Sequence, residues 1–332
     1  MDRKLVVVTD SVFPNLDPAR AVLSTIGADL QLAQDSARET IVRLAEGADA
    51  VLTTYAKLTA DMVAQLKRCR IIARFGVGVD NVDIATATRL GIVVTRVPDY
   101  CFDEVSDHTM ALLLALARKI PFIDAYTQRG AWEMKKVVPI HRLRGTVLGL
   151  VGFGGIPRIV APKARAFGMQ VVTYDPYVTE VACAAANVAR VEFDELLKIS
   201  DYISIHSPLT STTHHLFNAD TLSRMKPTAY LINTARGAIV DEAALGQALD
   251  RKQIAGAGLD VMEREPATSS PLFGRDNVII TPHMSFYSEE SLVDLQTKAA
   301  EEVVRVLSGQ APRNSVNPEA WSSGAAISST AL

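Results

Sequence analysis

The chain has 332 residues, of which 48% are hydrophobic and 21% are charged, and its formal net charge at pH 7 is −3. This length predicts about two domains with sizeable cores, and the interspersed charges, with no long basic run, argue against nucleic acid and membranes as partners. Three cysteines without metal or pairing spacing argue against a disulfide framework and predict a reducing, cytoplasmic location.

Short apolar runs alternate with helical patterns through the first hundred residues. The runs are continuously apolar, as expected of parallel strands that helices cover on both faces. They are LVVVTD (5–10), ADLQLA (28–33), AVLTT (50–54), IIARFG (71–76) and IVVTRV (92–97). This βαβ series predicts a doubly wound parallel sheet. The first run is also too short for the core of a signal peptide.

One long apolar helix is predicted over 103–128, and its apolar stretch is too short to span a bilayer. A second series follows, with six strands and helices between them, which is the strand count of a complete dinucleotide-binding domain. Its strands are predicted at 146–152, 170–175, 202–206, 229–235, 256–261 and 278–283. A last helix over 289–309 stops at Gly309, and the small, polar residues 321–332 are predicted to be disordered.

A glycine-rich turn follows the first strand of the second series, in LGLVGFGGIPRIVAPKARAFGM (148–169). Gly152 and Gly154 occupy the first two positions of the Gly-x-Gly-x-x-Gly pattern, and Pro157 occupies the third. The third glycine mainly serves helix packing, and proline is tolerated in the first helical turn. The turn therefore predicts a pyrophosphate site, although a purely structural βα turn is the alternative. Pro162 is expected to kink the helix.

Two further features favour a dinucleotide. The backbone N–H groups of Gly155 and Ile156 stay available for phosphate at the start of the helix. Asp175 ends the next strand about 20 residues later, where a carboxylate accepts both ribose hydroxyls of an adenine nucleotide. That carboxylate would repel a 2′-phosphate and no arginine follows it, so the sequence predicts NAD rather than NADP.

Polar groups also end later strands of the second series. They are Arg236 in INTARG, Asp260 and Glu265 in LDVMEREP, and His283 in ITPHMS. Taken alone, each of Arg236, Glu265 and His283 has a structural explanation, as a surface arginine, a solvated carboxylate or a hydrogen-bonded histidine. Because the carboxyl ends of parallel strands meet at one edge, all are expected where the glycine turn opens.

Arginine, histidine and carboxylate together make a recognisable chemical set. A guanidinium holds a carboxylate and polarises a carbonyl, histidine gives or takes a proton near neutrality, and a carboxylate orients that histidine and raises its pKa. Beside a nicotinamide, this set predicts reduction of a 2-oxo acid or oxidation of a 2-hydroxy acid. No metal site is predicted.

At these residues the chain resembles the D-isomer-specific 2-hydroxyacid dehydrogenases, over about Val6 to Pro318. The motifs are FGVGVDNVD (75–83), LGLVGFGGIP (148–157), HSPLTSTTHHLFN (206–218), LINTARGAIVDEAAL (231–245), AGLDVMEREP (257–266) and ITPHMSFYS (280–288). The resemblance implies an α/β protein of two doubly wound domains. A flavodoxin-like substrate domain takes 1–101 and 288–332, and an inserted Rossmann NAD-binding domain takes 102–287. It also implies hinges near 98–103 and 286–290, and a homodimer formed through the long helix.

The resemblance assigns roles by position. Arg236 would bind the substrate carboxylate and carbonyl, His283 would be the acid/base, and Glu265 would pair with it. From the other domain, the substrate carboxylate would be held by the backbone N–H groups of Val77 and Gly78. Contacts with the adenine side are assigned to His206, Pro208 and Thr213, and contacts with the nicotinamide end to Thr234, Ala235 and Asp260.

Departures from the family pattern narrow the function. Pro157 replaces the usual third glycine, and Gly155 stands where a larger residue is frequent. LTTYAKLT (52–59) lacks the arginine common in phosphoglycerate dehydrogenases, so Tyr55 or Lys57 is expected to shape the pocket. Glu265 argues against a formate dehydrogenase, in which the partner of the histidine is replaced.

Three functions remain in order. The first is an NAD-dependent reductase for a small 2-oxo acid such as glyoxylate or hydroxypyruvate. A D-3-phosphoglycerate dehydrogenase ranks lower, since no regulatory domain is expected after the last helix. The third is an NAD-sensing scaffold, because PHMSFYSEES and VPDYCFDEVSDHT resemble the branch that includes the C-terminal-binding-protein co-repressors.

Overall fold

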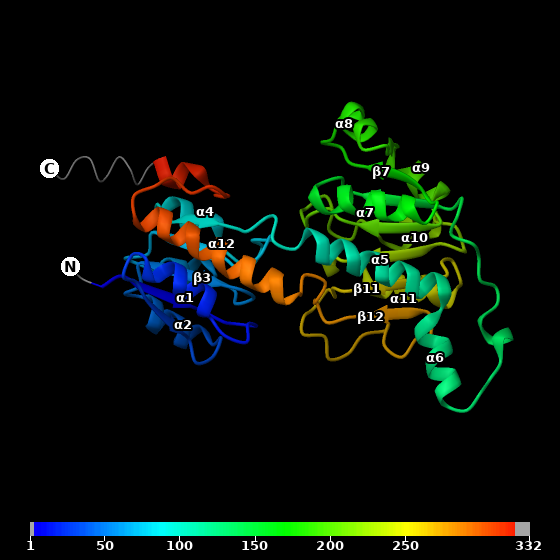
Figure 1. Ribbon diagram of the computed structural model, residues 1–332, viewed down its shortest axis with the longest axis horizontal. Helices are drawn as coiled ribbons and strands as arrows, with labels where there is room; N and C mark the ends of the chain where they lie inside the picture. The colour runs from blue at the N-terminus through cyan, green and yellow to red at the C-terminus, as the bar shows by residue number, and fades with distance from the viewer. Residues whose placement is uncertain (1–2, 323–332) are drawn as a thin grey trace. The chain divides into compact units, whose positions relative to one another are not determined.

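Apolar runs and amphipathic helices alternate along this chain, and they fold as two parallel sheets with helices packed around each (Figure 1). The computed structural model describes residues 3–322. The chain divides into two compact units, one made of the chain up to Tyr100 together with the chain from Ser288 on, and the other of Cys101–Tyr287. Both crossings fall within the segments predicted as hinges; that these segments bend stays a prediction.

The first unit holds a five-stranded parallel sheet in the order β2-β1-β3-β4-β5. This is the strand order of flavodoxin-like folds. Its elements are β1 (Leu5–Val8), α1 (Asp17–Ser24), β2 (Asp29–Leu32), α2 (Arg38–Ala45), β3 (Ala50–Thr53), α3 (Ala60–Val63), β4 (Ile71–Arg74), α4 (Ile84–Arg89), β5 (Val93–Thr95) and α12 (Glu289–Leu307).

Helix α12 comes from the end of the chain and packs against α1 and β4 of the first unit. It begins with a capping box in which the Ser288 hydroxyl accepts a bond from the Ser291 N–H and the Ser291 hydroxyl accepts one from the Ser288 N–H. Gly309, at φ +77°, follows its last turn. Of the tail predicted to be disordered, residues 321–322 lie in a helical turn and residues 323–332 lie outside the described residues.

The second unit holds a seven-stranded parallel sheet in the order β12-β11-β10-β9-β6-β7-β8. The sequence predicted six strands; the seventh, β8, has two residues at the sheet edge. The elements are α5 (Phe102–Arg118), α6 (Ile120–Gln128), η1 (Met134–Val137), β6 (Val147–Val151), α7 (Gly155–Ala166), β7 (Gln170–Tyr174), α8 (Glu180–Ala185), β8 (Ala189–Arg190), α9 (Phe193–Ile199), β9 (Tyr202–Ile205), α10 (Ala219–Ser223), β10 (Tyr230–Asn233), η2 (Gly237–Ile239), α11 (Glu242–Asp250), β11 (Gly256–Leu259) and β12 (Val278–Ile280).

The prediction of one helix over 103–128 is wrong. The helix breaks at Lys119, which adopts a left-handed conformation at φ 52° and separates α5 from α6. The cause is Pro121, whose ring would clash with the carbonyl four residues back and which lacks the N–H of a continuous helix. Proline is favourable in the first turn of a new helix, and there Pro121 lies, in α6. Helix α7, by contrast, is assigned as one helix through Pro162.

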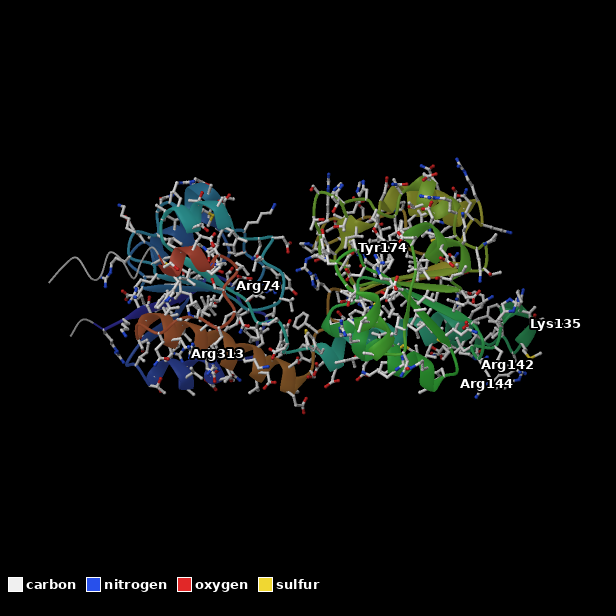
Figure 2. The ribbon with its side chains drawn as sticks, turned by 90° about the horizontal axis from the view of Figure 1, so that it is seen from above. Arg74, Lys135, Arg142, Arg144, Tyr174 and Arg313 are labelled. Carbon is white, nitrogen blue, oxygen red and sulfur yellow. The ribbon has the colours of Figure 1, made fainter. Side chains whose placement is uncertain are left out.

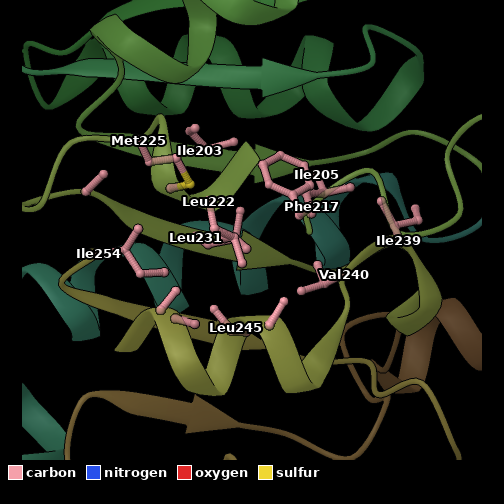
Figure 3. Close-up of a cluster of buried hydrophobic side chains, with 14 of the residues drawn as sticks. Ile203, Ile205, Phe217, Leu222, Met225, Leu231, Ile239, Val240, Leu245 and Ile254 are labelled. Atoms are coloured by element: carbon pink, nitrogen blue, oxygen red, sulfur yellow. The ribbon is translucent and has the colours of Figure 1, made fainter. Parts of the chain in front are cut away.

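Both faces of the second sheet are buried, which explains the continuous apolar runs. Successive residues of a strand point to opposite faces, and Leu231 accordingly lies in one buried cluster with Ile203 and Leu245 while Ile232 lies in the other with α5 and α7 side chains. Figure 3 shows the first of these clusters, between the strands and helix α11. No helix among residues 3–322 is long and apolar enough to cross a membrane.

Replacing Leu231 by alanine should cost about 2–5 kcal/mol of stability, because a fully buried leucine leaves a cavity in a packed cluster. Leu90→Ala is the matched control, since that leucine is 49% exposed, and it should change the midpoint of thermal unfolding little. Differential scanning calorimetry measures both. Equal midpoints for the two variants would contradict this account of the core.

Candidate active site

The pairing register aligns the strand ends of the second unit in one row. Paired residues run across the sheet from Tyr174 through Val151, Ile205, Asn233 and Leu259 to Ile280. The next residue of each strand therefore emerges at the same edge, where ligands bind in open parallel sheets. These residues are Gly152, Asp175, His206, Thr234, Asp260 and Thr281. All but Thr281 were predicted as site residues from the sequence.

The glycine turn joins β6 to α7. Gly152 has φ +93°, and a Cβ there would lie 3.0 Å from backbone atoms of His206 and Ser207, so only glycine fits. Gly154 caps α7, and a Cβ there would meet nothing within 4 Å. Helix geometry leaves the first N–H groups of α7, at Gly155 and Ile156, without an acceptor inside the helix. This is the arrangement that binds phosphate.

The two departures from the glycine pattern have local causes. A Cβ at Gly155 would come within 2.4 Å of the Phe102 ring, which packs over the turn from the start of α5. A larger residue at 155 therefore cannot be accommodated unless Phe102 moves. Pro157 is buried in the first turn of α7, where its missing N–H costs nothing.

Asp175 follows β7 beside the glycine turn. Its carboxylate accepts the N–H groups of Phe153 and Tyr177, each at 2.8 Å, so one side chain ties the glycine turn to the loop after β7. Arg190, on β8, donates to the Asp175 carbonyl at 3.2 Å. The sequence gave no sign of this arginine, because the contact forms through the unpredicted edge strand.

The loop after β9 carries the predicted adenine-side residues. Burial lowers the pKa of His206 to about 3, so its ring is neutral at physiological pH. A ring nitrogen, Nε2, lies 2.9 Å from the Ser204 hydroxyl. Further along, the Thr213 hydroxyl donates to the Pro208 carbonyl at 2.7 Å and accepts the Thr210 N–H at 2.7 Å. The loop thus has a defined shape without a ligand.

Arg236 lies two residues beyond the row of strand ends, after β10. Its Nη1 donates to the Ala235 carbonyl at 2.8 Å, and the Ala235 N–H donates to the Asn233 side chain at 3.0 Å. The Thr234 hydroxyl lies 3.1 Å from that of Thr109 on α5. These contacts shape the segment that carries the guanidinium.

Glu265 and His283 form a close pair. The Glu265 Oε2 atom lies 2.6 Å from His283 Nδ1, and Oε1 accepts the Met262 N–H at 2.9 Å. Because an ionised carboxylate only accepts hydrogen bonds, Nδ1 carries the proton and donates. The other ring nitrogen, Nε2, is then the one that can give or take a proton.

Electrostatics bring Arg236 into the same neighbourhood. Burial would raise the pKa of the Glu265 carboxyl, but the hydrogen bond from His283 and the positive charges of His283 and Arg236 outweigh it. The pKa of Glu265 therefore lies below its ordinary value, and the carboxylate stays ionised beside His283.

His283 has an unusual backbone. Its φ is 52°, in the left-handed region that costs a non-glycine residue about 1–2 kcal/mol. The His283 N–H donates to the Asp260 carbonyl at 2.7 Å, and the Asp260 carboxylate, which is 1% exposed with its residue, accepts the N–H groups of Met284 and Ser285 at 2.9 Å each. The buried side chain of Asp260 thus holds the turn that carries His283. Any contact of Asp260 with a cofactor stays a prediction.

Val77 and Gly78 belong to the first unit, in the loop after β4. The preceding Phe75 is buried against Phe13, with ring centroids 4.9 Å apart. On a neighbouring loop, the Asp10 carboxylate accepts the N–H groups of Thr54 and Tyr55 at 3.0 and 2.7 Å. The roles predicted for Val77, Gly78 and Tyr55 stay predictions.

Within residues 3–322, no group of three or more histidine, cysteine or acidic side chains is arranged to hold a metal ion.

Comparison with known proteins gives a consistent result. The family model for "D-isomer specific 2-hydroxyacid dehydrogenase, NAD binding domain" matches residues 110–285. The chain is 38% identical over 314 residues to a D-3-phosphoglycerate dehydrogenase of Methanocaldococcus jannaschii, covering 94% of this chain but only 59% of that enzyme. It is 39% identical over 282 residues to a glyoxylate reductase of Thermococcus litoralis, covering 83% of this chain and 85% of that enzyme.

A solved structure shares the fold over nearly the whole chain. The D-lactate dehydrogenase of Aquifex aeolicus, solved with NAD and lactic acid, superposes with a TM-score of 0.82 at 29% identity. The match covers 95% of this chain and 99% of that one.

Glu265→Gln should lower the thermal midpoint at about pH 7, and the difference from the unaltered protein should fade as the pH falls to about 3. A carboxyl whose pKa is lowered by folding stabilises the folded state above its ordinary value of 4.5, and this stabilisation is lost as the pH falls through the lowered pKa. Glu195→Gln, an exposed change on α9, is the control. A difference that grows toward acid pH would refute the assignment.

Proposed function

The chain belongs to the D-isomer-specific 2-hydroxyacid dehydrogenase family, and we propose that it is an NAD-dependent enzyme that interconverts a small 2-oxo acid and the corresponding D-2-hydroxy acid. Glyoxylate or hydroxypyruvate is the proposed type of substrate. The observation that carries the proposal is the Glu265–His283 pair, with Arg236 in electrostatic reach, at the sheet edge where the glycine turn opens.

The side chains suit proton transfer and carboxylate binding. NAD(H), when bound, supplies or accepts the hydride at C2. His283 would give a proton to the substrate oxygen from Nε2, or take one there, while Glu265 holds Nδ1 and stabilises the charged ring. Arg236 would bind the substrate carboxylate through its planar fork and polarise the neighbouring carbonyl.

The NAD-binding residues are those of the row of strand ends and the glycine turn. Gly152, Gly154 and the N–H groups of Gly155 and Ile156 would bind the pyrophosphate, and Asp175 the adenosine ribose. The remaining predicted contacts are proposed for His206, Pro208, Thr213, Thr234, Ala235 and Asp260. The solved D-lactate dehydrogenase that shares this fold was crystallised with NAD, which supports the choice of cofactor.

The substrate proposal favours a small, unphosphorylated acid. Tyr55 and Lys57 stand in the segment that lacks the arginine expected for a phosphorylated substrate. The phosphoglycerate dehydrogenase alternative is favoured by the 38% identity to the M. jannaschii enzyme, but the chain spans only 59% of that enzyme's length. The glyoxylate reductase of T. litoralis is matched over 85% of its length.

A homodimer and a cytoplasmic location are part of the proposal. Helix α6 has no buried residue despite its apolar sequence, and large apolar side chains are exposed around it, including Ile120, Trp132 and Met134. Lys135, Arg142 and Arg144 lie near one another at the same end of the second unit (Figure 2). This surface suits a second copy of the chain, and sedimentation of a monomer at assay concentrations would overturn the dimer.

The test of the function is NADH oxidation with a panel of acids: glyoxylate, hydroxypyruvate, pyruvate, 2-oxoglutarate and phosphohydroxypyruvate. We expect the highest kcat/KM for glyoxylate or hydroxypyruvate. A preference for phosphohydroxypyruvate would favour the phosphoglycerate dehydrogenase instead. Tight NADH binding without turnover of any acid would favour the NAD-sensing scaffold.

His283→Ala should lower kcat by about 10²–10⁴-fold, which is the usual contribution of a general acid or base. The affinity for NADH, measured by quenching of its fluorescence, should stay within about twofold, because the change removes a proton donor and leaves the glycine turn intact. A fully active variant would remove His283 from the proposed mechanism.

Asp175→Ala should raise the ratio of kcat/KM with NADPH to that with NADH by about tenfold or more, because two like charges about 4 Å apart repel by at least about 1 kcal/mol. Asp175→Asn is the companion variant, since it removes the charge but can still accept the Tyr177 N–H. If the unaltered enzyme already prefers NADPH, the ribose assignment is wrong.

A further inference from the structure

A histidine outside the predicted site contacts the turn that carries His283. His108 lies on α5, and its side chain is 20% exposed. Its Nε2 atom lies 2.9 Å from the Thr281 hydroxyl, although the two residues are 173 positions apart in the sequence. The same hydroxyl lies 2.6 Å from Asp260 Oδ1. His108 Nε2 is itself 3.7 Å from that oxygen.

The direction of these hydrogen bonds follows from their chemistry. The Thr281 hydroxyl has one proton, and the ionised Asp260 carboxylate can only accept, so the hydroxyl donates to Asp260. It must therefore accept from His108, whose Nε2 carries a proton. The result is a directed chain from the α5 histidine through Thr281 to the buried carboxylate.

Asp260 passes this constraint to the turn of His283. The Oδ1 atom that Thr281 contacts also accepts the Met284 N–H, and Oδ2 accepts the Ser285 N–H. The Asp260 carbonyl accepts the N–H of His283 itself. Bonds to residues 283, 284 and 285 therefore start from one aspartate, and they hold the left-handed backbone of His283.

We propose that His108 is a positioning residue for His283. It donates to Thr281, which orients the Asp260 carboxylate, and Asp260 holds the backbone that aims the His283 ring. The inference rests on the proposed function, because it assumes that His283 transfers the proton. A general acid displaced by a fraction of an ångström loses rate in the chemical step, while binding of the acid and NADH depends on other groups.

The experiment compares variants that break the chain with variants that keep it. His108→Leu and Thr281→Val remove the donor and the hydroxyl, whereas His108→Gln and Thr281→Ser retain them. His141→Leu, an exposed histidine on the segment before β6, is the control. For each variant, kcat, KM for the preferred 2-oxo acid, NADH affinity and the thermal midpoint are measured.

We expect kcat to fall by roughly tenfold or more in His108→Leu and in Thr281→Val, with KM and NADH affinity within about twofold. His108→Gln and Thr281→Ser should stay within about threefold of the unaltered enzyme. Because both residues act through one chain, the double variant should lose no more than the worse single variant. Unchanged kcat in His108→Leu, or additive losses, would overturn the proposal.

A crystal structure of His108→Leu separates this inference from the proposed function. If no acid is turned over by the unaltered protein, the proposed function fails, but the positioning is still tested. The inference expects a changed φ at His283 and a Glu265 Oε2–His283 Nδ1 separation longer than 2.6 Å. An unchanged turn in that variant would overturn it, whatever the activity.

Discussion

The parallel register of the second sheet is the constraint on which the site depends. Helices cover both faces, so the strands are apolar throughout and their polar groups can emerge only where the strands end. The pairing from Tyr174 to Ile280 aligns those ends in one row. A glycine turn, a ribose-binding carboxylate and a histidine turn, which are far apart in sequence, reach one edge without any loop having to span the sheet.

Much of this arrangement could be predicted from the sequence, because a buried parallel strand has a local signature. A continuous apolar run that ends in a polar or glycine residue marks both the strand and the edge, and this was enough to find Asp175, Arg236 and His283 as candidates. The break at Lys119 was missed although Pro121 marks it, since the apolar pattern continues across the proline. Strand β8 was missed because two residues carry no periodicity.

The chain of bonds from His108 to Asp260 could not have been predicted from such patterns. His108 lies on a helix whose apolar spacing suggests only packing, and its partner Thr281 stands beside a proline and a histidine that draw attention first. What makes the contact is the packing of α5 against β10, β11 and β12, which depends on the whole unit. Asp260 likewise resembles a ligand-binding carboxylate in sequence, whereas its side chain is used by the backbone of residues 284 and 285.

The division of the chain into two units has an evolutionary consequence. Arg236, Glu265 and His283 all lie in the second unit, whereas Tyr55 and the Val77–Gly78 loop lie in the first. Mutations that retune the choice of acid can therefore accumulate in one unit while the proton-transfer pair in the other is inherited unchanged. A lineage built on this chain can diversify its diet of metabolites without reinventing its chemistry.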